Sequence, residues 1–373
     1  FSLEYGPDWR KWPAALQRSQ KAPKVRDQDL KFTKWLQWKA DRQLGAAQAK
    51  ARSDGMALGL YLDLAVGARA GGAESWGSNN ATASGVTLGA PPDHLSPAGQ
   101  NWQLAANAPR KLQATRYAGF RHVLRASMRH CGLLRIDHAL GLNRSFWIPE
   151  DGSPGGYVRQ NMAALVAVIS IEAARAQTVV VGEDLGLVPG GFRKAMAQFG
   201  FYGYSVLQYE KNKEGRFLPA SSLRTQSLAC FATHDTPTLA GFWEGRDIAW
   251  WEKLGWITQK EAAKAASRRG AEKRQLVRVS APQPLPKTAT HGVRDTIHAT
   301  LAGAPAELVA VQLEDVFLQK ETQNLPGTVD EHPNWRRPLP LTLKEISASP
   351  ELEKTARIMA RSGRAGQTRK DIS

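Results

Sequence analysis

Six short apolar runs recur along the chain, and each is followed by polar or charged residues. Most of them are continuous rather than alternating, which is typical of strands that are covered on both faces. The pattern therefore predicts six strands, at residues 58–67, 131–137, 178–186, 204–210, 228–235 and 306–315.

Helical patterns lie between these predicted strands. Four of them are clear in the sequence, at residues 114–130, 162–177, 190–200 and 258–279. Strands that alternate with helices form right-handed βαβ units, which assemble into a parallel sheet. The order of the elements therefore places the chain in the α/β class.

Two α/β architectures compete at this point, a doubly wound open sheet and a (β/α)8 TIM barrel. A doubly wound nucleotide-binding protein should carry a glycine-rich fingerprint after its first strand, and "VGARAGGAESWG" matches neither that fingerprint nor a P-loop. What recurs instead is a carboxylate at the end of five predicted strands. Barrel enzymes assemble their active sites from such strand ends, so we favour a barrel with about six of its eight strands present. The strand-end carboxylates are Asp63, Asp137, Glu183, Asp235, and Glu314 with Asp315.

The neighbours of these carboxylates indicate different chemical roles. Arg135 and Asp137 are two residues apart and project to the same side of a strand, so the arginine is expected to lower the pKa of Asp137. Such a carboxylate suits a nucleophile or a stabiliser of positive charge. Glu183 has no neighbouring cation, and a glutamate near other carboxylates in a partly apolar site has a raised pKa, as a general acid requires. His234 precedes Asp235 and is either a hydrogen-bond donor to substrate or an ordinary core histidine.

One ionised and one protonatable carboxylate form the pair that retaining glycoside chemistry uses. Two other uses remain open, because a strand-end carboxylate can cap the following helix and three carboxylates can hold a divalent metal ion. The metal alternative is disfavoured because the strand predicted at 204–210 lacks a matching carboxylate between Glu183 and Asp235. Zinc-ligand spacing is also absent from the nearest candidate group, which is His122, His130 and Cys131.

The net charge of +16 raises the question of nucleic-acid binding. The basic residues are scattered, however, and the densest cluster, at 266–280, contains no aromatic residue. We therefore interpret that cluster as a solvated helical face with its connector and expect no nucleic-acid partner. The 12 tryptophans are compatible with stacking on either bases or sugars.

No segment of the sequence predicts insertion into a membrane. The most apolar stretch, at 162–177, is interrupted by Glu172 and Arg175 and is interpreted as an amphipathic helix. The chain begins with a polar and aromatic segment rather than a signal peptide, and its two cysteines, Cys131 and Cys230, form no disulfide framework. We therefore expect a cytoplasmic protein.

Three segments, "LRIDHALGLNRSFWIP", "VVGEDLGLVP" and "FATHDTPTLAGFWE", carry a resemblance to a known family. They resemble the signature regions of the 4-α-glucanotransferases of glycoside hydrolase family 77, also called amylomaltases or disproportionating enzymes. These are retaining barrel enzymes of the α-amylase clan. Further matching segments are "LDLAVG", "GAPPDHLSPAGQNW", "VQLED", "NLPGT" and "NWRR". The similarity extends over residues 32–340, which is nearly the whole chain.

The resemblance implies a role for each member of a catalytic triad. Asp137 would be the nucleophile and Glu183 the acid/base. Asp235 would hold hydroxyls of the reacting sugar and stabilise the transition state. Arg135 and His234 would support these residues and bind substrate. Further contacts to substrate are implied for Asp63, Asp93, Leu95 and Trp102.

Two departures from the family accompany the resemblance. Residues 103–105 are Gln-Leu-Ala where members usually have Gly-Leu-Pro. The chain also begins at Phe1 without the family's first two barrel strands, so we expect the C-terminal part of such an enzyme. The implied organisation is a helical lead-in segment at 1–50, barrel strands three to eight with inserted substrate-covering loops at 51–345, and a C-terminal helix and basic tail at 346–373.

The resemblance implies a hexosyltransferase that transfers α-1,4-glucan segments between maltooligosaccharides by a retaining double displacement. Maltooligosaccharides, amylose and starch-like α-1,4-glucans are the implied partners, and no metal or organic cofactor is implied. Nothing in the sequence indicates an oligomeric state. Two alternatives are kept, a truncated glucan-binding fragment without activity and a retaining α-glucan hydrolase of the same clan.

Overall fold

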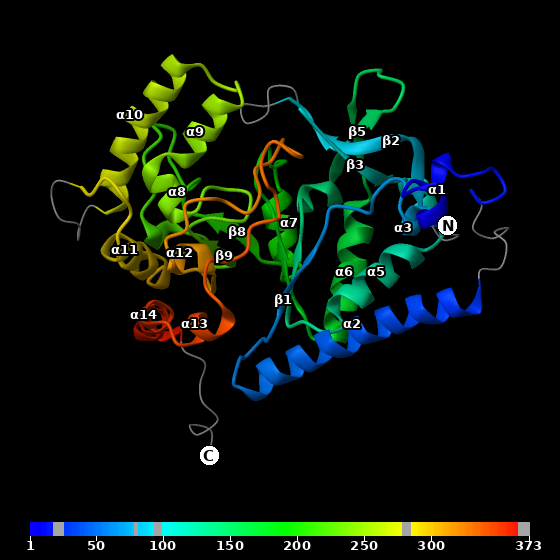
Figure 1. The fold of residues 1–373 in the computed structure, drawn as a ribbon, viewed down its shortest axis with the longest axis horizontal. Coiled ribbons are helices and arrows are strands. Elements are labelled where there is room, and N and C mark those ends of the chain that lie inside the picture. The colour runs from blue at the N-terminus through cyan, green and yellow to red at the C-terminus, as the bar shows by residue number, and fades with distance from the viewer. Residues whose placement is uncertain (18–25, 78–80, 93–98, 278–284, 365–373) are drawn as a thin grey trace. The chain divides into compact units, whose positions relative to one another are not determined.

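The structure of the 373-residue chain is a computed structural model that describes residues 1–17, 26–77, 81–92, 99–277 and 285–364 (Figure 1). The chain divides into two compact units, Phe1–Gly203 and Tyr204–Ser373. Each unit has a hydrophobic core of its own. Asp93 and Leu95, two of the predicted substrate contacts, lie outside the described residues.

The first unit contains a parallel sheet built from three of the predicted strands. β1 (Tyr61–Leu64), β4 (Leu133–Ile136) and β7 (Val179–Gly182) pair in the order β1-β4-β7. Asp63 lies opposite Arg135 in the register of β1 and β4. All of β4 and most of β7 are buried, which explains the continuous apolar runs that predicted them.

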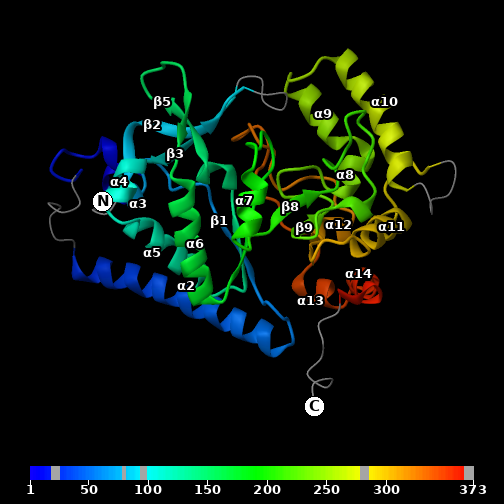
Figure 2. The ribbon, with the colours of Figure 1, turned by 180° about the vertical axis from the view of Figure 1, so that it is seen from behind.

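Two helices, α5 (Ala118–Met128) and α6 (Met162–Ala176), lie side by side in both ribbon views (Figures 1 and 2). Their apolar side chains join those of the parallel sheet in a single core, which includes Leu124, Leu134 and Ile169. Burial of that shared apolar surface is what attaches the helices to the sheet.

Glu172 interrupts the apolar run of α6 because it accepts a cluster of ion pairs. Its buried carboxylate lies 3.3 Å from Arg121 and 2.8 Å from Arg125, both on α5, and 3.2 Å from Arg175 on its own helix. A buried carboxylate is tolerated only when it is paired in this way. The polar break in the sequence therefore marks the place where α6 is tied to α5.

A second sheet in the first unit was not predicted from the sequence. Its four strands are antiparallel and pair in the order β3-β2-β5-β6. β2 and β3 carry glycine, threonine, asparagine or glutamine at partly exposed positions, and β5 and β6 are short and begin or end with arginine, so the four strands lack the long apolar runs that identified the parallel strands. The strands are β2 (Thr82–Ala90), β3 (Gln100–Asn107), β5 (Arg144–Pro149) and β6 (Gly156–Arg159).

The N-terminal part of the first unit is dominated by the long helix α2 (Asp27–Ser53), none of whose residues is buried. Asp41 attaches this helix to the rest of the unit through Arg129 and His130, each 2.8 Å from its carboxylate. Within the described ranges, no helix is both long and apolar enough to cross a membrane. The remaining short elements are α1 (Ser2–Tyr5), η1 (Trp9–Lys11), α3 (Ala73–Trp76), α4 (Pro109–Ala114), η3 (Ala139–Leu142) and α7 (Phe192–Gln198).

The second unit holds the other three predicted strands in a separate sheet. β8 (Gly203–Val206), β9 (Ser227–Cys230) and β10 (Leu308–Val309) pair in the order β10-β9-β8, and β9 runs parallel to β10. Phe231 and Trp243 belong to the core of this unit. Its helical elements are η4 (Ala220–Ser222), α8 (Leu239–Glu244), α9 (Arg246–Lys253), α10 (Gln259–Leu276), α11 (His291–Ala302), α12 (Leu313–Val316), α13 (Leu343–Ser347), α14 (Pro350–Met359) and η5 (Ala360–Arg364).

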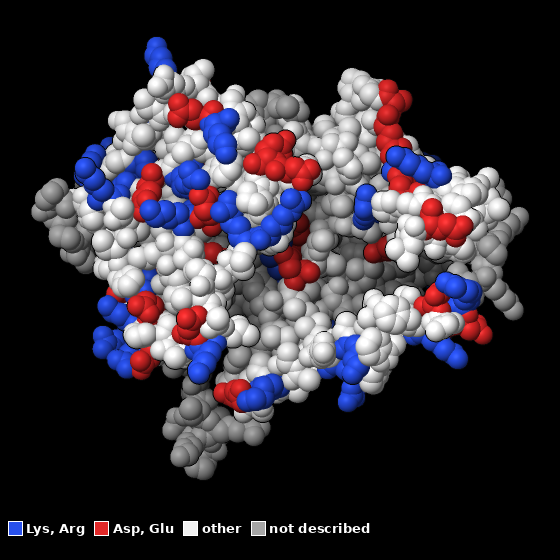
Figure 3. All heavy atoms as spheres, viewed as in Figure 1, with Lys and Arg blue, Asp and Glu red and all other residues white. Residues whose placement is uncertain are grey.

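The densest basic cluster of the sequence lies partly in α10, and one of its arginines is not solvated as expected. Arg269 is buried, and its guanidinium lies 2.7 Å from Asp247 and 3.1 Å from Glu272. Figure 3 shows Lys and Arg side chains interspersed with Asp and Glu over the face in view. On that face the positive charge does not gather into one continuous patch.

Each of the six predicted strand segments overlaps an observed strand, and the α/β class is confirmed. The observed strands are shorter than predicted, because each of them has only two to four residues. The four predicted helical segments contain α5, α6, α7 and α10.

Candidate active site

Polar side chains gather where the parallel strands of the first unit end. Asp63 is the third residue of β1, Asp137 follows the last residue of β4, and Glu183 follows the last residue of β7. The strands are parallel and in register, so these three carboxylates emerge at the same edge of the sheet. The structure therefore brings three of the predicted strand-end carboxylates to one edge of one sheet.

Arg135 joins two of these carboxylates. Its Nη1 atom lies 2.9 Å from both carboxylate oxygens of Asp63, and its Nη2 atom lies 2.6 Å from Oδ1 of Asp137. The guanidinium is buried, whereas Asp137 keeps 30% of its side chain exposed. A planar arginine fork can fix two carboxylates at once. The buried guanidinium therefore orients the Asp137 carboxylate, and the carboxylate remains accessible to solvent.

Glu183 occupies a different environment from Asp137. Its carboxyl group is buried and accepts the backbone N–H groups of Leu185, at 2.8 Å, and His138, at 2.9 Å. The pKa of Glu183 is raised to about 7. Burial is the largest cause and the negative charge of Asp137 acts in the same direction, whereas the two N–H groups and Arg135 act against them. The direction predicted from the sequence is confirmed, and the group can carry a proton near neutral pH.

His138 is a site residue that the sequence analysis did not single out. Its backbone adopts the left-handed conformation, with φ of 44°, and its imidazole packs edge-on against Trp102, with ring centroids 5.2 Å apart. Burial lowers the pKa of His138 and favours the neutral ring. The available signal was its position beside Asp137 in "LRIDH".

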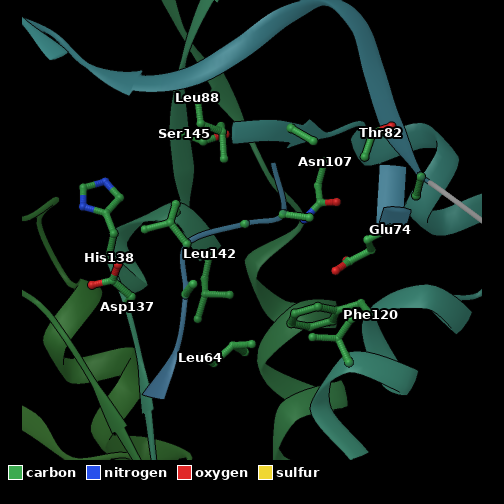
Figure 4. Close-up of a pocket in the computed structure, with 18 of the residues that line it drawn as sticks. Leu64, Glu74, Thr82, Leu88, Asn107, Phe120, Asp137, His138, Leu142 and Ser145 are labelled. Atoms are coloured by element: carbon green, nitrogen blue, oxygen red, sulfur yellow. The ribbon is translucent and has the colours of Figure 1, made fainter. Parts of the chain in front are cut away.

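A pocket of about 510 Å³ opens beside Asp137 and His138 within the first unit (Figure 4). Leu64 and Phe120 contribute to its apolar walls, and the carboxyl group of Glu74 points into it. Desolvation raises the pKa of Glu74. The predicted contact Trp102 also lines this pocket.

The departure from the family at Gln103 preserves a backbone feature. Gln103 has φ of 55°, a left-handed conformation that glycine adopts without strain and other residues seldom adopt. The position where family members usually carry glycine therefore keeps a glycine-like backbone. Its turn is supported by Asn101, whose side-chain oxygen accepts the Gln103 N–H at 2.9 Å.

The second unit carries the other two predicted site residues. His234 and Asp235 follow β9, and His234 Nε2 lies 3.3 Å from Asp235 Oδ2. The side chain of Asn324 donates a hydrogen bond to Oδ1 of Asp235 at 2.6 Å. Thr322 Oγ1 and the N–H of Asn324 each donate to the carbonyl oxygen of His234 at 3.0 Å. His234 is therefore held beside Asp235 by a distant loop.

Two residues of that loop were not assigned a role from the sequence. Asn324 belongs to "NLPGT" and Trp335 to "NWRR", segments that were noted only as matching the family. The ring centroids of Trp335 and His234 are 5.1 Å apart. Both residues are remote from Asp235 in sequence, so only the folded loop reveals the contacts.

Not every strand-end carboxylate belongs to a site. Asp315 is buried and accepts the backbone N–H of Leu239, the first residue of α8, at 2.7 Å. Burial raises the pKa of Asp315 to about 7. Glu314 accepts a hydrogen bond from Gln323 at 2.9 Å. Asp315 therefore binds a helix N-terminus, but the helix is α8, which precedes Asp315 in the chain, and not the following helix that the capping alternative named.

The structure thus brings Asp63, Arg135, Asp137 and Glu183 together in the first unit, and His234 and Asp235 together in the second. Among the described residues, no group of three histidine, cysteine, aspartate or glutamate side chains is arranged to hold a metal ion. Asp93 and Leu95 have no described position.

Comparison with known proteins gives a consistent match. A family model described as 4-alpha-glucanotransferase matches residues 3–342. The 4-alpha-glucanotransferase of Mycobacterium tuberculosis is 38% identical, with 92% of this chain and 50% of the relative covered. That of Haemophilus influenzae is 35% identical, with 92% and 51% covered. The chain therefore spans about half the length of these relatives.

Solved structures agree with the sequence matches. The crystal structure of amylomaltase from Corynebacterium glutamicum is 33% identical, with a TM-score of 0.83, covering 91% of this chain and 52% of that one. An amylomaltase from Streptococcus agalactiae, solved in complex with acarbose, is 16% identical, with a TM-score of 0.74, covering 98% of this chain and 70% of that one. The second likeness concerns the fold alone.

Proposed function

Because the chain belongs to the 4-alpha-glucanotransferase family, we propose that it transfers α-1,4-glucan segments between maltooligosaccharides by a retaining double displacement. The observation that carries the proposal is the contrast between two neighbouring carboxylates. Asp137 is paired with a buried arginine, whereas Glu183 is buried with a pKa of about 7. One group is suited to nucleophilic attack and the other to proton transfer.

In the proposed first step, a carboxylate oxygen of Asp137 attacks the anomeric carbon of the donor glucan. The glycosidic C–O bond breaks, its electron pair goes to the leaving oxygen, and Glu183 gives that oxygen its proton. The released chain departs, and the remaining segment is held on Asp137 as a β-linked ester. Arg135 keeps the attacking carboxylate oriented through its contact with Oδ1.

In the second step, a hydroxyl group of an acceptor glucan attacks the anomeric carbon of this ester. Glu183, now ionised, takes the hydroxyl proton, and the C–O bond to Asp137 breaks. Two inversions restore the α configuration, and Asp137 and Glu183 return to their starting states. Attack by water instead of a sugar hydroxyl would produce hydrolysis.

We assign Asp235 to the sugar in the reactive subsite, where it would hold hydroxyl groups and stabilise the oxocarbenium-like transition state. Its contacts support this role, because Asn324 and His234 orient its two oxygens from different sides. Asp63, Trp102, Asp93 and Leu95 are proposed as further substrate contacts.

The proposed function also implies an arrangement of the strands. We propose that β1, β4, β7, β8, β9 and β10 are strands three to eight of a (β/α)8 barrel, with a lead-in segment at 1–50, the barrel at 51–345 and a C-terminal part at 346–373. Amylose and starch-like α-1,4-glucans are the proposed substrates. Cys131 and Cys230 are free thiols, which fits the reducing conditions of the cytoplasm.

Incubation of the protein with maltotriose tests the proposed activity. We expect glucose together with a ladder of longer maltooligosaccharides, resolved by chromatography. Glucose and maltose without a ladder would identify a hydrolase, and no product at all would identify an inactive glucan-binding fragment. Asp137→Asn is the matched control, because it keeps the size of the side chain and removes the nucleophile. A ladder that persists in this variant would show that Asp137 is not the nucleophile.

A further inference from the structure

Trp335 combines two properties that are unusual together. Trp335 is 63% exposed to solvent, although burial of a large apolar ring would stabilise the protein. Its backbone has φ of 57°, in the left-handed region that bulky residues avoid. Such a conformation is strained and persists only where the surrounding structure imposes it.

The surrounding loop does impose this conformation. The N–H of Trp335 donates to the carbonyl oxygen of Gln323 at 2.9 Å, and the Gln323 side chain is itself bound to Glu314 at 2.9 Å. The preceding residue, Asn334, accepts the N–H of Leu325 at 3.0 Å. The loop therefore holds the indole in the exposed position.

Neighbouring contacts add a buried support beneath the loop. His332 is fully buried, packs against the ring of Trp250 with centroids 4.9 Å apart, and lies 2.7 Å from Asn334 through Nδ1. Asn334 also donates to Thr328 Oγ1 at 2.9 Å. A loop fixed by this many contacts holds the backbone that carries Trp335 in place.

The exposed ring stands beside polar groups that suit a sugar. Its centroid lies 5.1 Å from that of His234, whose Nε2 is 3.3 Å from Asp235. Asn324 binds the other oxygen of Asp235 at 2.6 Å. The flat apolar ring thus adjoins an imidazole, which in turn lies beside a carboxylate that an amide also binds. A glucopyranose has the complementary surface, with an apolar C–H face and hydroxyl groups around its rim.

Trp38 is also exposed, but its ring has a different neighbour. Trp38 on α2 is 53% exposed, but Lys39 places its ammonium group over the ring, 5.4 Å from the centroid. Lys39 also lies 5.7 Å from the centroid of Trp35. Cation–π contacts account for that surface. Trp335 instead adjoins His234, which lies beside Asp235.

We propose that Trp335 is a substrate-binding residue whose indole stacks against a glucosyl residue next to the sugar held by Asp235. The C–H groups of the sugar face carry partial positive charge and pack against the negative face of the ring. The assignment rests on the proposed function, because it takes the same α-1,4-glucan as ligand. It adds a specificity determinant, since stacking favours an extended glucan over a single glucose.

Calorimetric titration with maltoheptaose tests the assignment without requiring turnover. Trp335→Ala should weaken binding about tenfold, which corresponds to about 1.4 kcal/mol. Trp335→Phe should retain most of the affinity because a flat ring remains. Trp38→Ala is the matched control and should bind like the unaltered protein. A dissociation constant for Trp335→Ala within twofold of the unaltered protein would overturn the assignment, and so would the absence of maltoheptaose binding by the unaltered protein.

Trp335→Gly is a control for misfolding of Trp335→Ala, because glycine adopts the left-handed backbone conformation without strain. It should be at least as stable as Trp335→Ala in thermal unfolding and should show the same loss of affinity. In the maltotriose assay, KM should rise about tenfold in both variants while kcat changes much less. A loss in kcat with an unchanged KM would contradict stacking.

The two proposals can fail separately. If the unaltered protein binds maltoheptaose but forms no ladder, the proposed transferase activity is wrong, and the comparison of binding constants still decides the role of Trp335.

Discussion

The backbone N–H of His138 donates a hydrogen bond to Oε2 of Glu183 over 2.9 Å, so the residue after Asp137 holds the carboxyl group at the end of the neighbouring strand. The next N–H, that of Ala139, donates to the carbonyl oxygen of Glu183 at 2.9 Å. The turn after β4 therefore carries Asp137 and also fixes Glu183. These two hydrogen bonds fix the position of the proposed acid/base relative to the turn that carries the proposed nucleophile.

The first prediction concerns the pH dependence of activity. Glu183 must be protonated to act as the acid, and burial places its pKa at about 7. We expect kcat/KM for maltotriose to fall as the pH rises through about 7, where Glu183 loses its proton. Glu183→Gln should lower kcat by about 10²–10⁴-fold, the usual contribution of general acid–base catalysis. Any residual activity of that variant should lack the alkaline decline. If kcat/KM of Glu183→Gln declined with the same midpoint pH, the decline would be due to a group other than Glu183.

A second prediction concerns the arginine fork. Arg135→Lys keeps the positive charge but cannot span Asp63 and Asp137 with two terminal nitrogens as arginine does. We expect a loss of about 1–3 kcal/mol in the free energy of unfolding, because the buried guanidinium makes charge-assisted hydrogen bonds to two partly exposed carboxylates and lysine cannot make both. The rate of ladder formation from maltotriose should fall as Asp137 loses its orientation.

Arg26→Lys provides the matched control for Arg135. Arg26 lies 2.8 Å from Asp29, and the two side chains are 86% and 57% exposed, so their ion pair is screened by solvent. Urea unfolding of both variants should show a much smaller change at Arg26. Full activity and unchanged stability in Arg135→Lys would argue against a role for the fork.

A third prediction concerns Asn324, which we regard as a positioning residue for Asp235. Asn324→Ala removes the hydrogen bond of 2.6 Å to Oδ1, and Asn324→Asp replaces the donor with a second carboxylate at the same place. We expect kcat to fall in both variants and to fall further in Asn324→Asp, because like charges repel. Steady-state kinetics over a range of pH provide the measurement. Activity of Asn324→Asp that recovers on acidification would support the electrostatic explanation, whereas equal losses in both variants at every pH would contradict it.

The fourth prediction concerns stability. The pKa of Asp315 is raised by burial from 3.8 to about 7, so the folded protein binds a proton that the unfolded chain has released. Its contribution to stability is fully present below about pH 4 and is lost as the pH rises through about 7. Asp315→Asn is neutral at every pH, and its oxygen can still accept the N–H of Leu239. Relative to the unaltered protein, the variant should be more stable at pH 8 than at pH 5 in urea unfolding.

The difference between the two proteins at the two pH values isolates Asp315, because all other groups titrate in both. One pKa unit corresponds to about 1.4 kcal/mol, so a shift of this size should be measurable. A variant that is destabilised equally at pH 5 and pH 8 would show that Asp315 is ionised in the folded protein.

The sequence alone located the parallel strands and the carboxylates at their ends, because a strand covered on both faces must be a continuous apolar run. It also predicted the raised pKa of Glu183, since burial beside another carboxylate acts on that group whatever the details of packing. The antiparallel sheet was missed because β2, β3, β5 and β6 owe their stability to pairing between strands, and their side chains are partly exposed.

Tertiary structure decided which of the similar carboxylates serve a site. Asp137 and Asp315 both occur at predicted strand ends, yet one meets a buried arginine and the other a helix N-terminus. Asn324 and Trp335 reach His234 and Asp235 across about a hundred residues of sequence through one loop. Local patterns determine what a segment can form, whereas contacts between distant segments depend on how the chain packs, and those contacts select the partner of each polar group.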